Sequence, residues 1–248
     1  MPDHHIFALY YPLLSARYGA VPVGSSFELD DRELIHRMTR VLRLHTGKEL
    51  VLFDRDKHMH VTIQATSEKK ATLFVKEAKE NHPLQPTINL GLPLLKRRDL
   101  EEAIYAATEV GMNSIHLIET DKCERACDKQ ALYERLERVS IAAAEQAKQF
   151  ALPPIHTPVP LEVWLQRSTG ITIFFDPDGS ALYEVAGTLR DQQPQTINLL
   201  VGPEGDLISK EKETLRAKEA TFCSLTPTVL RAHQAIAVGC GAIRALLI

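Results

Sequence analysis

The chain has 248 residues, of which 44% are hydrophobic and 25% are charged, a composition typical of a folded globular protein with one or two domains. It contains no apolar run long enough to cross a membrane and no leader of the secretory type, and its four cysteines are too few for a disulfide framework, so we expect a cytoplasmic protein. The formal net charge of −3 excludes a generally basic nucleic-acid-binding protein, so any such site depends on local charge.

Residues 1–80 are predicted to form a small domain rich in β-strands. Short runs of strand-forming residues stand at three places: Glu49–Phe53, Val61–Ala65 and Ala71–Val75. The turn-type segment Asp54–Lys57 separates the first two runs, as in a β-hairpin. The proline-containing segment Asn81–Pro86 interrupts regular structure and predicts a linker. We therefore expect a small barrel or sandwich over residues 1–80 and a second domain over residues 81–248.

Within the first domain, Leu34–Leu44 has the pattern of an amphipathic helix. At 3.6 residues per turn, its apolar side chains share one side: Leu34, Ile35, Met38, Val41 and Leu42. Three arginines fall on roughly the opposite side: Arg37, Arg40 and Arg43. Two interpretations stay open. The arginines form either an ordinary solvated helix face or a patch that binds RNA phosphates, which arginine contacts with two parallel hydrogen bonds.

After the linker, the pattern changes to strands that alternate with helices. Strand-like runs stand at Thr87–Leu94, Ser114–Ile118, Ile171–Phe175, Ile197–Val201 and Ala220–Leu225. Helical patterns cover Asp99–Val110, Asp128–Phe150, Leu161–Gln166, Ala181–Leu189, Ser209–Lys218 and Ala232–Leu247. Asp128 and Ser209 are the predicted N-caps of their helices. The alternation indicates an α/β fold whose mostly parallel sheet is covered by helices on both faces.

Two turns near the end of the chain have the pattern of a ligand site. Asn198–Gly205 is a buried strand followed by a Gly-Pro-Glu-Gly turn, and Leu225–Arg231 is a polar loop before an apolar helix. Both turns are expected at the carboxyl ends of neighbouring strands, where ligands bind in α/β sheets. Gly202 and Gly205 leave the backbone bare enough for a ligand to lie against it. An ordinary turn has the same composition, so the turn alone leaves both interpretations open.

In their order and spacing, these segments resemble the RsmE-type 16S rRNA (uracil-N3)-methyltransferases of the SPOUT superfamily. The resemblance covers nearly the whole chain. In the N-terminal domain it rests on Arg40–Arg43 with Gly47, and on Leu52–Asp54. In the second domain it rests on five segments: Glu109–Gly111, Ile141–Gln146, Pro154-Ile155, Leu200–Gly205 and Val229–Arg231.

This resemblance implies a PUA-like RNA-binding β-barrel, followed by an α/β methyltransferase domain whose C-terminal segment forms a trefoil knot. It implies S-adenosyl-L-methionine (SAM) as cofactor, a homodimer, and 16S rRNA or the small ribosomal subunit as partner. It assigns cofactor binding to two loops: Leu200, Val201, Gly202, Pro203, Glu204 and Gly205 in one, and Leu225, Thr226, Val229, Leu230 and Arg231 in the other. Leu92–Leu94 and Phe175–Pro177 are the expected neighbours of these loops. Neither a membrane nor a metal ion is expected.

Methylation of uracil N3 requires the loss of a ring proton as the nitrogen attacks the methyl group, and it needs no covalent enzyme nucleophile. Arg231 is predicted to stabilise the negative charge that develops on the uracil carbonyls. Glu204, His233 or water is the predicted proton acceptor, although both side chains could instead hold local structure. Cys123 and Cys127 are interpreted as free thiols rather than zinc ligands, because no second pair of ligands stands nearby.

Several positions depart from the family pattern. Ala106 replaces a lysine, Thr120–Lys122 replaces Thr-Glu-Arg, Lys148-Gln149 replaces an arginine, Asp206 and Thr226 each replace a glycine, and His233-Gln234 replaces Glu-Thr. These departures keep further hypotheses open. One is a non-catalytic protein of the same fold that binds RNA or assists ribosome assembly, and another is a methyltransferase that acts on a different RNA.

Overall fold

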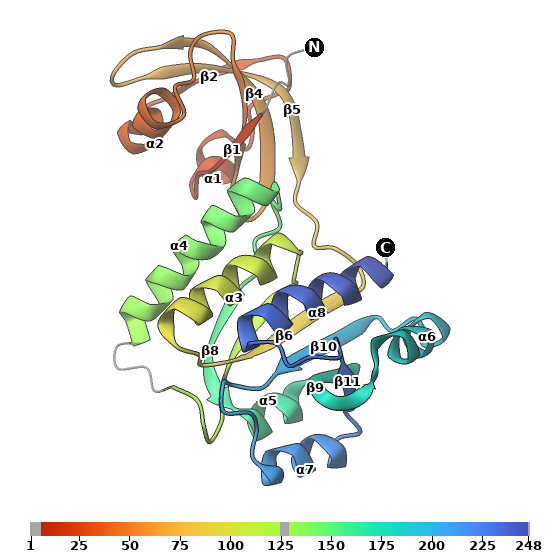
Figure 1. The fold of residues 1–248 in the computed structure, drawn as a ribbon. Coiled ribbons are helices and arrows are strands. Elements are labelled where there is room, and N and C mark those ends of the chain that lie inside the picture. Colours follow the sequence, from red (N-terminus) through yellow and green to blue (C-terminus); the bar gives the residue numbers. More distant parts are fainter. Residues whose placement is uncertain (1–5, 125–128, 248) are drawn as a thin grey trace. The chain divides into compact units, whose positions relative to one another are not determined.

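The computed structural model describes residues 6–124 and 129–247. The chain folds into two compact units (Figure 1). The first unit comprises the chain up to His82 together with Ala144–Ala151, and the second comprises Pro83–Ala143 and the chain from Leu152 onward. No helix in the described part of the chain is long and apolar enough to span a membrane.

A five-stranded sheet in the order β1-β3-β4-β5-β2 forms the frame of the first unit. Its strands are β1 (Phe7–Tyr10), β2 (Ser26–Leu29), β3 (Glu49–Phe53), β4 (Lys57–Thr66) and β5 (Ala71–Glu80). β1 runs parallel to β3, and the other neighbours are antiparallel. The predicted hairpin between β3 and β4 is confirmed, with Phe53 opposite His58. The sequence missed β1, β2 and the single helical turn α1 (Leu14–Tyr18), because elements of four or five residues are too short to show a period.

The predicted arginine helix is only partly correct. The short helix α2 (Arg32–His36) continues as a π-helical turn, η1 (Arg37–Val41), in which the Leu42 N–H donates to the Arg37 carbonyl at 2.9 Å. The wider turn breaks the 3.6-residue period. Met38 is buried as predicted, but Val41, which was expected on the same buried side, is 63% exposed.

The Thr39 hydroxyl donates to the Ile35 carbonyl at 2.8 Å. The same bond forms in the regular helix α3 (Arg97–Glu109), where the Thr108 hydroxyl donates to the Ile104 carbonyl at 2.9 Å, so it does not account for the wider turn. A helical projection at constant period cannot represent a π-helical turn, and for this reason it placed Val41 on the wrong side.

The second unit contains a six-stranded sheet in the order β11-β9-β10-β6-β7-β8, in which every neighbouring pair is parallel. Its strands are β6 (Thr87–Pro93), β7 (Ser114–Glu119), β8 (Ile155–Pro160), β9 (Ile171–Ala181), β10 (Thr196–Val201) and β11 (Thr221–Ser224). The helices are α3 (Arg97–Glu109), α4 (Lys129–Ala147), α5 (Leu161–Arg167), α6 (Leu182–Gln192), α7 (Ser209–Ala217) and α8 (Ala232–Leu246). The α/β fold with a parallel sheet is thereby confirmed.

Helices cover both faces of this sheet (Figure 1). Side chains of α3, α6 and α8 pack on one face, and those of α5 and α7 pack on the other. Successive strand residues point to opposite faces: Leu199 belongs to the cluster under α8, and Leu200 belongs to the cluster under α5 and α7. The core of the second unit therefore consists of two apolar layers separated by the sheet.

The remaining differences lie at the ends of elements. The strand β8 was not predicted, because its sequence Ile-His-Thr-Pro-Val-Pro has no buried apolar run. Ser209 is not the N-cap of α7. The helix begins after Ile208, whose N–H donates to the Glu211 carboxylate at 2.9 Å. The predicted N-cap Asp128 lies outside the described residues.

Candidate active site

A cavity of about 830 Å³ opens in the second unit where β6, β10 and β11 reach their carboxyl ends and β9 passes the end of β10. Nine of the predicted cofactor residues line it: Val201, Gly202, Pro203, Glu204, Leu225, Thr226, Val229, Leu230 and Arg231. Leu200 does not line it, because that side chain points to the opposite face of the sheet. Gly205 also lies outside its lining, although the Gly205 carbonyl accepts a hydrogen bond from Lys122 Nζ at 2.7 Å. The parallel sheet thus brings the two predicted loops to one cavity.

The turn after β10 is held at both of its ends. The Asp206 N–H donates to the Pro203 carbonyl at 2.9 Å and closes the turn. Glu204 Oε1 accepts a hydrogen bond from the Lys96 N–H at 3.1 Å, which ties the turn to the start of α3. A Cβ atom added at Gly202 would lie 3.0 Å from Asp206 Oδ1. The backbone at Gly202 is therefore open to a ligand on the cavity side and crowded on the side of Asp206.

The second loop ends at Arg231, the last residue before α8. Its backbone is extended, and its carbonyl accepts the Ala235 N–H at 2.8 Å, so the helix fixes the position of Arg231. The Arg231 side chain is exposed and lines the cavity. Val229, two residues earlier, is 80% exposed. An arginine held at the cavity by its backbone, with a solvent-accessible guanidinium, can meet a ligand that enters from outside.

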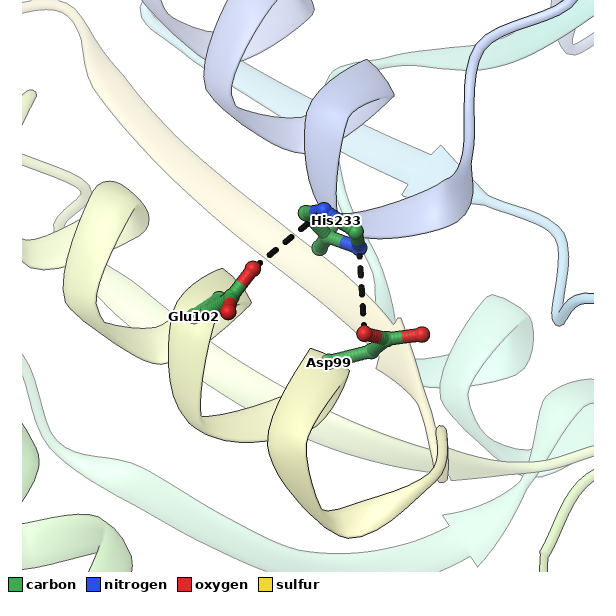
Figure 2. Close-up of side chains that lie close together, drawn as sticks. All are labelled: Asp99, Glu102 and His233. Carbon is green, nitrogen blue, oxygen red and sulfur yellow. Dashed lines mark ion pairs between the residues drawn. The ribbon is translucent and has the colours of Figure 1, made fainter.

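His233 lies between two carboxylates of α3 (Figure 2). Its Nδ1 is 3.5 Å from Asp99 Oδ1, and its Nε2 is 3.3 Å from Glu102 Oε2. Asp99 lines the cavity, and His233 does not. The structure therefore does not bring His233 to the cavity beside Arg231 and Glu204. Potential ligand atoms of these three side chains lie within 4.8 Å of one another, and the expected absence of a metal stays a prediction.

Sequence reasoning missed several residues of the cavity wall. Lys96 and Asp99 come from the start of α3, where no motif marks them. Asp176 was included only as a neighbour at a strand end, and Asp178 was not predicted. Asp176 and Asp178 lie inside β9 (Ile171–Ala181), which continues past the predicted end at Phe175. What the four residues share is their position beside the carboxyl ends of β6 and β10.

Comparison with known proteins gives this cavity its context. Residues 80–244 match the family described as RNA methyltransferase domain. Ribosomal RNA small subunit methyltransferase E from Rickettsia conorii is 25% identical over 228 residues, which span 90% of this chain and 91% of that protein. The protein of the same name from Synechocystis is 28% identical over 224 residues, 86% of this chain and 71% of that protein.

Solved structures show the same fold. Ribosomal RNA small subunit methyltransferase E from Neisseria gonorrhoeae, solved with bound SAM, aligns over 98% of both chains with a TM-score of 0.81 and 19% identity. A putative methyltransferase from Legionella pneumophila, also solved with SAM, aligns over 97% of this chain and 98% of that chain with a TM-score of 0.78 and 23% identity.

The chain belongs to the RNA methyltransferase domain family. The resemblance that its motifs predicted is thereby confirmed. In this methyltransferase, the two loops that the resemblance singled out are those that meet at the cavity.

The three predicted RNA-binding arginines of the methyltransferase lie in the first unit and differ in environment. Arg37 pairs with Glu145, whose carboxylate lies 2.7 Å from the guanidinium. Arg40 and Arg43 are exposed, and Arg43 follows the π-helical turn with a left-handed φ of 53°. The patch therefore contains one arginine engaged by a carboxylate and two that are accessible.

Of the two cysteines considered as thiols, Cys123 accepts a weak hydrogen bond from the Thr120 N–H at 3.4 Å. Cys127 lies outside the described residues. The interpretation of this pair as free thiols stays a prediction.

Proposed function

We propose that the protein transfers the methyl group of SAM to N3 of a uridine in the 16S rRNA of the small ribosomal subunit. The observation that carries the proposal is the cavity at the carboxyl ends of the parallel strands, lined by the loops Val201–Glu204 and Leu225–Arg231. The names of the relatives, ribosomal RNA small subunit methyltransferase E, and the SAM bound in the two similar structures support the same cofactor and substrate.

The chemistry of the cavity suits SAM. Five carboxylates line it, from Asp99, Asp176, Asp178, Glu204 and Asp206, against two cations, from Lys96 and Arg231. Such an acidic lining favours a ligand that carries a sulfonium and an ammonium group. Val201, Leu225 and Leu230 supply apolar surface for an adenine ring. When bound, SAM supplies the electrophilic methyl group.

Within this proposal, the protein acts mainly by positioning and by fixed charge. Holding the uracil nitrogen in line with the methyl carbon and the sulfur lowers the entropic part of the barrier. The Arg231 guanidinium stabilises the charge that develops on a uracil carbonyl. Glu204 at the cavity, or water, accepts the N3 proton, and His233 can do so only through Asp99 or after a change of side-chain rotamer.

The proposal extends to finer features of the fold and assembly. We infer that residues 1–80 form a PUA-like RNA-binding barrel, and that residues 81–248 form a SPOUT domain whose C-terminal segment is knotted. Arg40 and Arg43 contact RNA phosphates, with Arg37 beside them. The functional form is a homodimer in the cytoplasm, where ribosomal subunits are assembled, and it requires no metal ion.

Two measurements test the function. Isothermal calorimetry should show SAM binding to the purified protein, and mass spectrometry of 16S rRNA should show the loss of one N3-methyluridine in a deletion strain, restored by the gene. A folded protein that binds 16S rRNA but not SAM would support the non-catalytic RNA-binding or ribosome-assembly role instead. Loss of a methyl group from a different RNA would replace the substrate and keep the reaction.

A further inference from the structure

Lys212 on α7 connects two segments of the cavity wall. Its Nζ lies 2.7 Å from Asp176 Oδ2 and 2.7 Å from Asp206 Oδ2. Asp176 belongs to β9, Asp206 ends the turn after β10, and both residues line the cavity. Lys212 itself is not among the lining residues. One cation outside the cavity therefore joins two segments that shape it.

The pair of Lys212 with Asp176 is largely withdrawn from solvent, because the Lys212 side chain is 19% exposed and that of Asp176 is 3% exposed. The third member of the bridge, Asp206, has a side chain that is 53% exposed. Burial disfavours the charged ammonium, but the hydrogen bonds that it donates to Asp176 and Asp206 outweigh this and raise the pKa of Lys212 above its usual value. The Asp178 N–H also donates to Asp176 Oδ1 at 2.9 Å. Charge pairs of this kind have defined geometry, because a buried ion without its partner is strongly unfavourable.

Asp206 has a left-handed backbone conformation. Its φ of 58° lies in a region that most residues with a side chain seldom adopt, but in which aspartate is enriched. Its Oδ1 accepts the Leu207 N–H at 2.7 Å, and its Oδ2 contacts Lys212. Because a Cβ at Gly202 would lie 3.0 Å from the same Oδ1, the orientation of the Asp206 side chain also sets the space around Gly202.

We propose that Lys212 is a positioning residue for the methyl donor. By holding Asp176 and Asp206 together, it fixes the turn after β10 against β9 and so sets the shape of the cofactor site. This inference rests on the proposed function, because it names the cofactor that the fixed turn serves. Lys212 does not touch the cofactor and acts through the two aspartates.

A positioning role and a purely electrostatic role predict opposite signs. SAM carries a net positive charge, so removing a nearby cation should tighten its binding if charge alone matters. If Lys212 holds the turn in place, its removal should weaken binding. The affinity for S-adenosyl-L-homocysteine, which lacks the sulfonium charge, should then fall by about the same factor as the affinity for SAM.

The experiment compares Lys212→Met and Lys212→Arg with Lys210→Met, an exposed lysine of the same helix. We expect Lys212→Met to bind SAM and S-adenosyl-L-homocysteine at least tenfold more weakly by calorimetry. Lys212→Arg should bind SAM only about threefold more weakly than wild type. Lys210→Met should bind SAM as tightly as wild type. Single-turnover rates at saturating SAM should change much less than KM.

Two further measurements keep the test decisive. Asp206→Asn retains a residue that tolerates the left-handed region and breaks one ion pair. Asp206→Asn should weaken SAM binding. The double variant with Lys212→Met should bind SAM about as weakly as Lys212→Met alone. Hydrogen exchange at Leu207 should be at least tenfold faster in Lys212→Met and unchanged in Lys210→Met, whether or not SAM binds. If the wild-type protein fails to bind SAM, only the proposed function is contradicted. If Lys212→Met binds SAM as tightly as wild type or more tightly, and hydrogen exchange at Leu207 is unchanged, the positioning role is overturned.

Discussion

At the scale of single residues, the proposed chemistry depends on Arg231 more than on any other side chain of the cavity. Its backbone is fixed by the start of α8, and its guanidinium makes no ion pair with a residue in the described ranges 6–124 and 129–247. A cation that is not already engaged can interact fully with charge that appears on the substrate. Interactions that are stronger in the transition state than in the ground state increase turnover.

We therefore predict that Arg231→Ala lowers the single-turnover methylation rate by roughly tenfold to a thousandfold, as loss of one oxyanion donor typically does. SAM affinity should change little. Arg231→Lys should recover only part of the rate, because lysine lacks the planar guanidinium. Rates should be measured on RNA that wild type methylates, across pH, beside His233→Ala. A wild-type rate in Arg231→Ala would rule out this role, and an unchanged pH profile in His233→Ala would rule out His233 as the base.

Gly202 provides a second prediction for a single residue. In Gly202→Val the added Cβ would lie 3.0 Å from Asp206 Oδ1, so the Asp206 side chain and the turn at the cavity wall must shift, and SAM should bind at least tenfold more weakly. Gly187→Val on α6 is the matched control, because no described atom outside its own helix lies within 4 Å of its added Cβ. Calorimetry and the melting temperature should be measured for both. Tight SAM binding by a folded Gly202→Val variant would show that the cofactor lies elsewhere.

At the scale of secondary-structure elements, the pair β7–β8 contains a half-buried histidine that lowers stability in acid. His116 on β7 and His156 on β8 stack with ring centroids 4.2 Å apart. Burial, and to a smaller extent His156, lowers the pKa of His116 from 6.5 to about 4. The folded protein therefore binds this proton less readily than the unfolded chain. The contribution of His116 to the free energy of unfolding is therefore fully present above pH 6.5, and it is lost as the pH falls towards 4.

We predict that the free energy of unfolding falls by on the order of 2 kcal/mol between pH 6.5 and 4 because of His116, allowing for its partial exposure. His116→Gln should remove this part of the pH dependence. His82→Gln, at an exposed position, should leave it unchanged. Chemical denaturation at several pH values gives the comparison. Parallel stability curves for wild type and His116→Gln would contradict the assignment.

The elements α2 and η1 carry the prediction for RNA. Because Arg37 is engaged by Glu145, Arg40 and Arg43 should supply the phosphate contacts. Arg40→Ala with Arg43→Ala should weaken rRNA binding and lower the salt slope by about 2, with SAM affinity unchanged. Arg37→Ala should change the slope less. Lys69→Ala, an exposed lysine of the same unit, is the control. An unchanged salt slope in the double variant would exclude this patch.

At the scale of the whole molecule, α8 has one face that its own chain covers and one that it leaves exposed. Ala235 and Gly239 face the core, and a Cβ at Gly239 would lie 2.4 Å from the Phe175 ring. These small residues therefore serve packing within the protomer. The opposite face carries Ala237 and Val238, which is 43% exposed.

We predict a homodimer that covers this exposed face of α8, because small and apolar side chains permit close packing of helices from two copies. Sedimentation at micromolar concentration should show a dimer. Val238→Arg should shift it towards monomer, and Val23→Glu, an exposed valine of the first unit, should not. A monomeric wild type at these concentrations would refute the prediction.

The sequence by itself determined the fold of the second unit and the two loops of the cavity. Apolar strands such as Ile197–Val201 must be buried on both faces, so their order with intervening helices defines a parallel sheet. Gly202 and Arg231 could be singled out because turns at the carboxyl ends of such strands meet at one edge. The bounds β3 (Glu49–Phe53) and β10 (Thr196–Val201) differ from the predicted ones by at most one residue.

Only the tertiary structure decided which side chains meet. The ion pair of Lys212 with Asp176, and the placement of His233 between Asp99 and Glu102, join residues that are far apart in sequence. No periodicity or motif encodes such distances, because they depend on how α7 and α8 pack on the sheet. The burial of Met38 and the exposure of Val41 likewise follow from the π-helical turn over Arg37–Val41. Local patterns therefore determine elements, and packing determines the chemistry that those elements bring together.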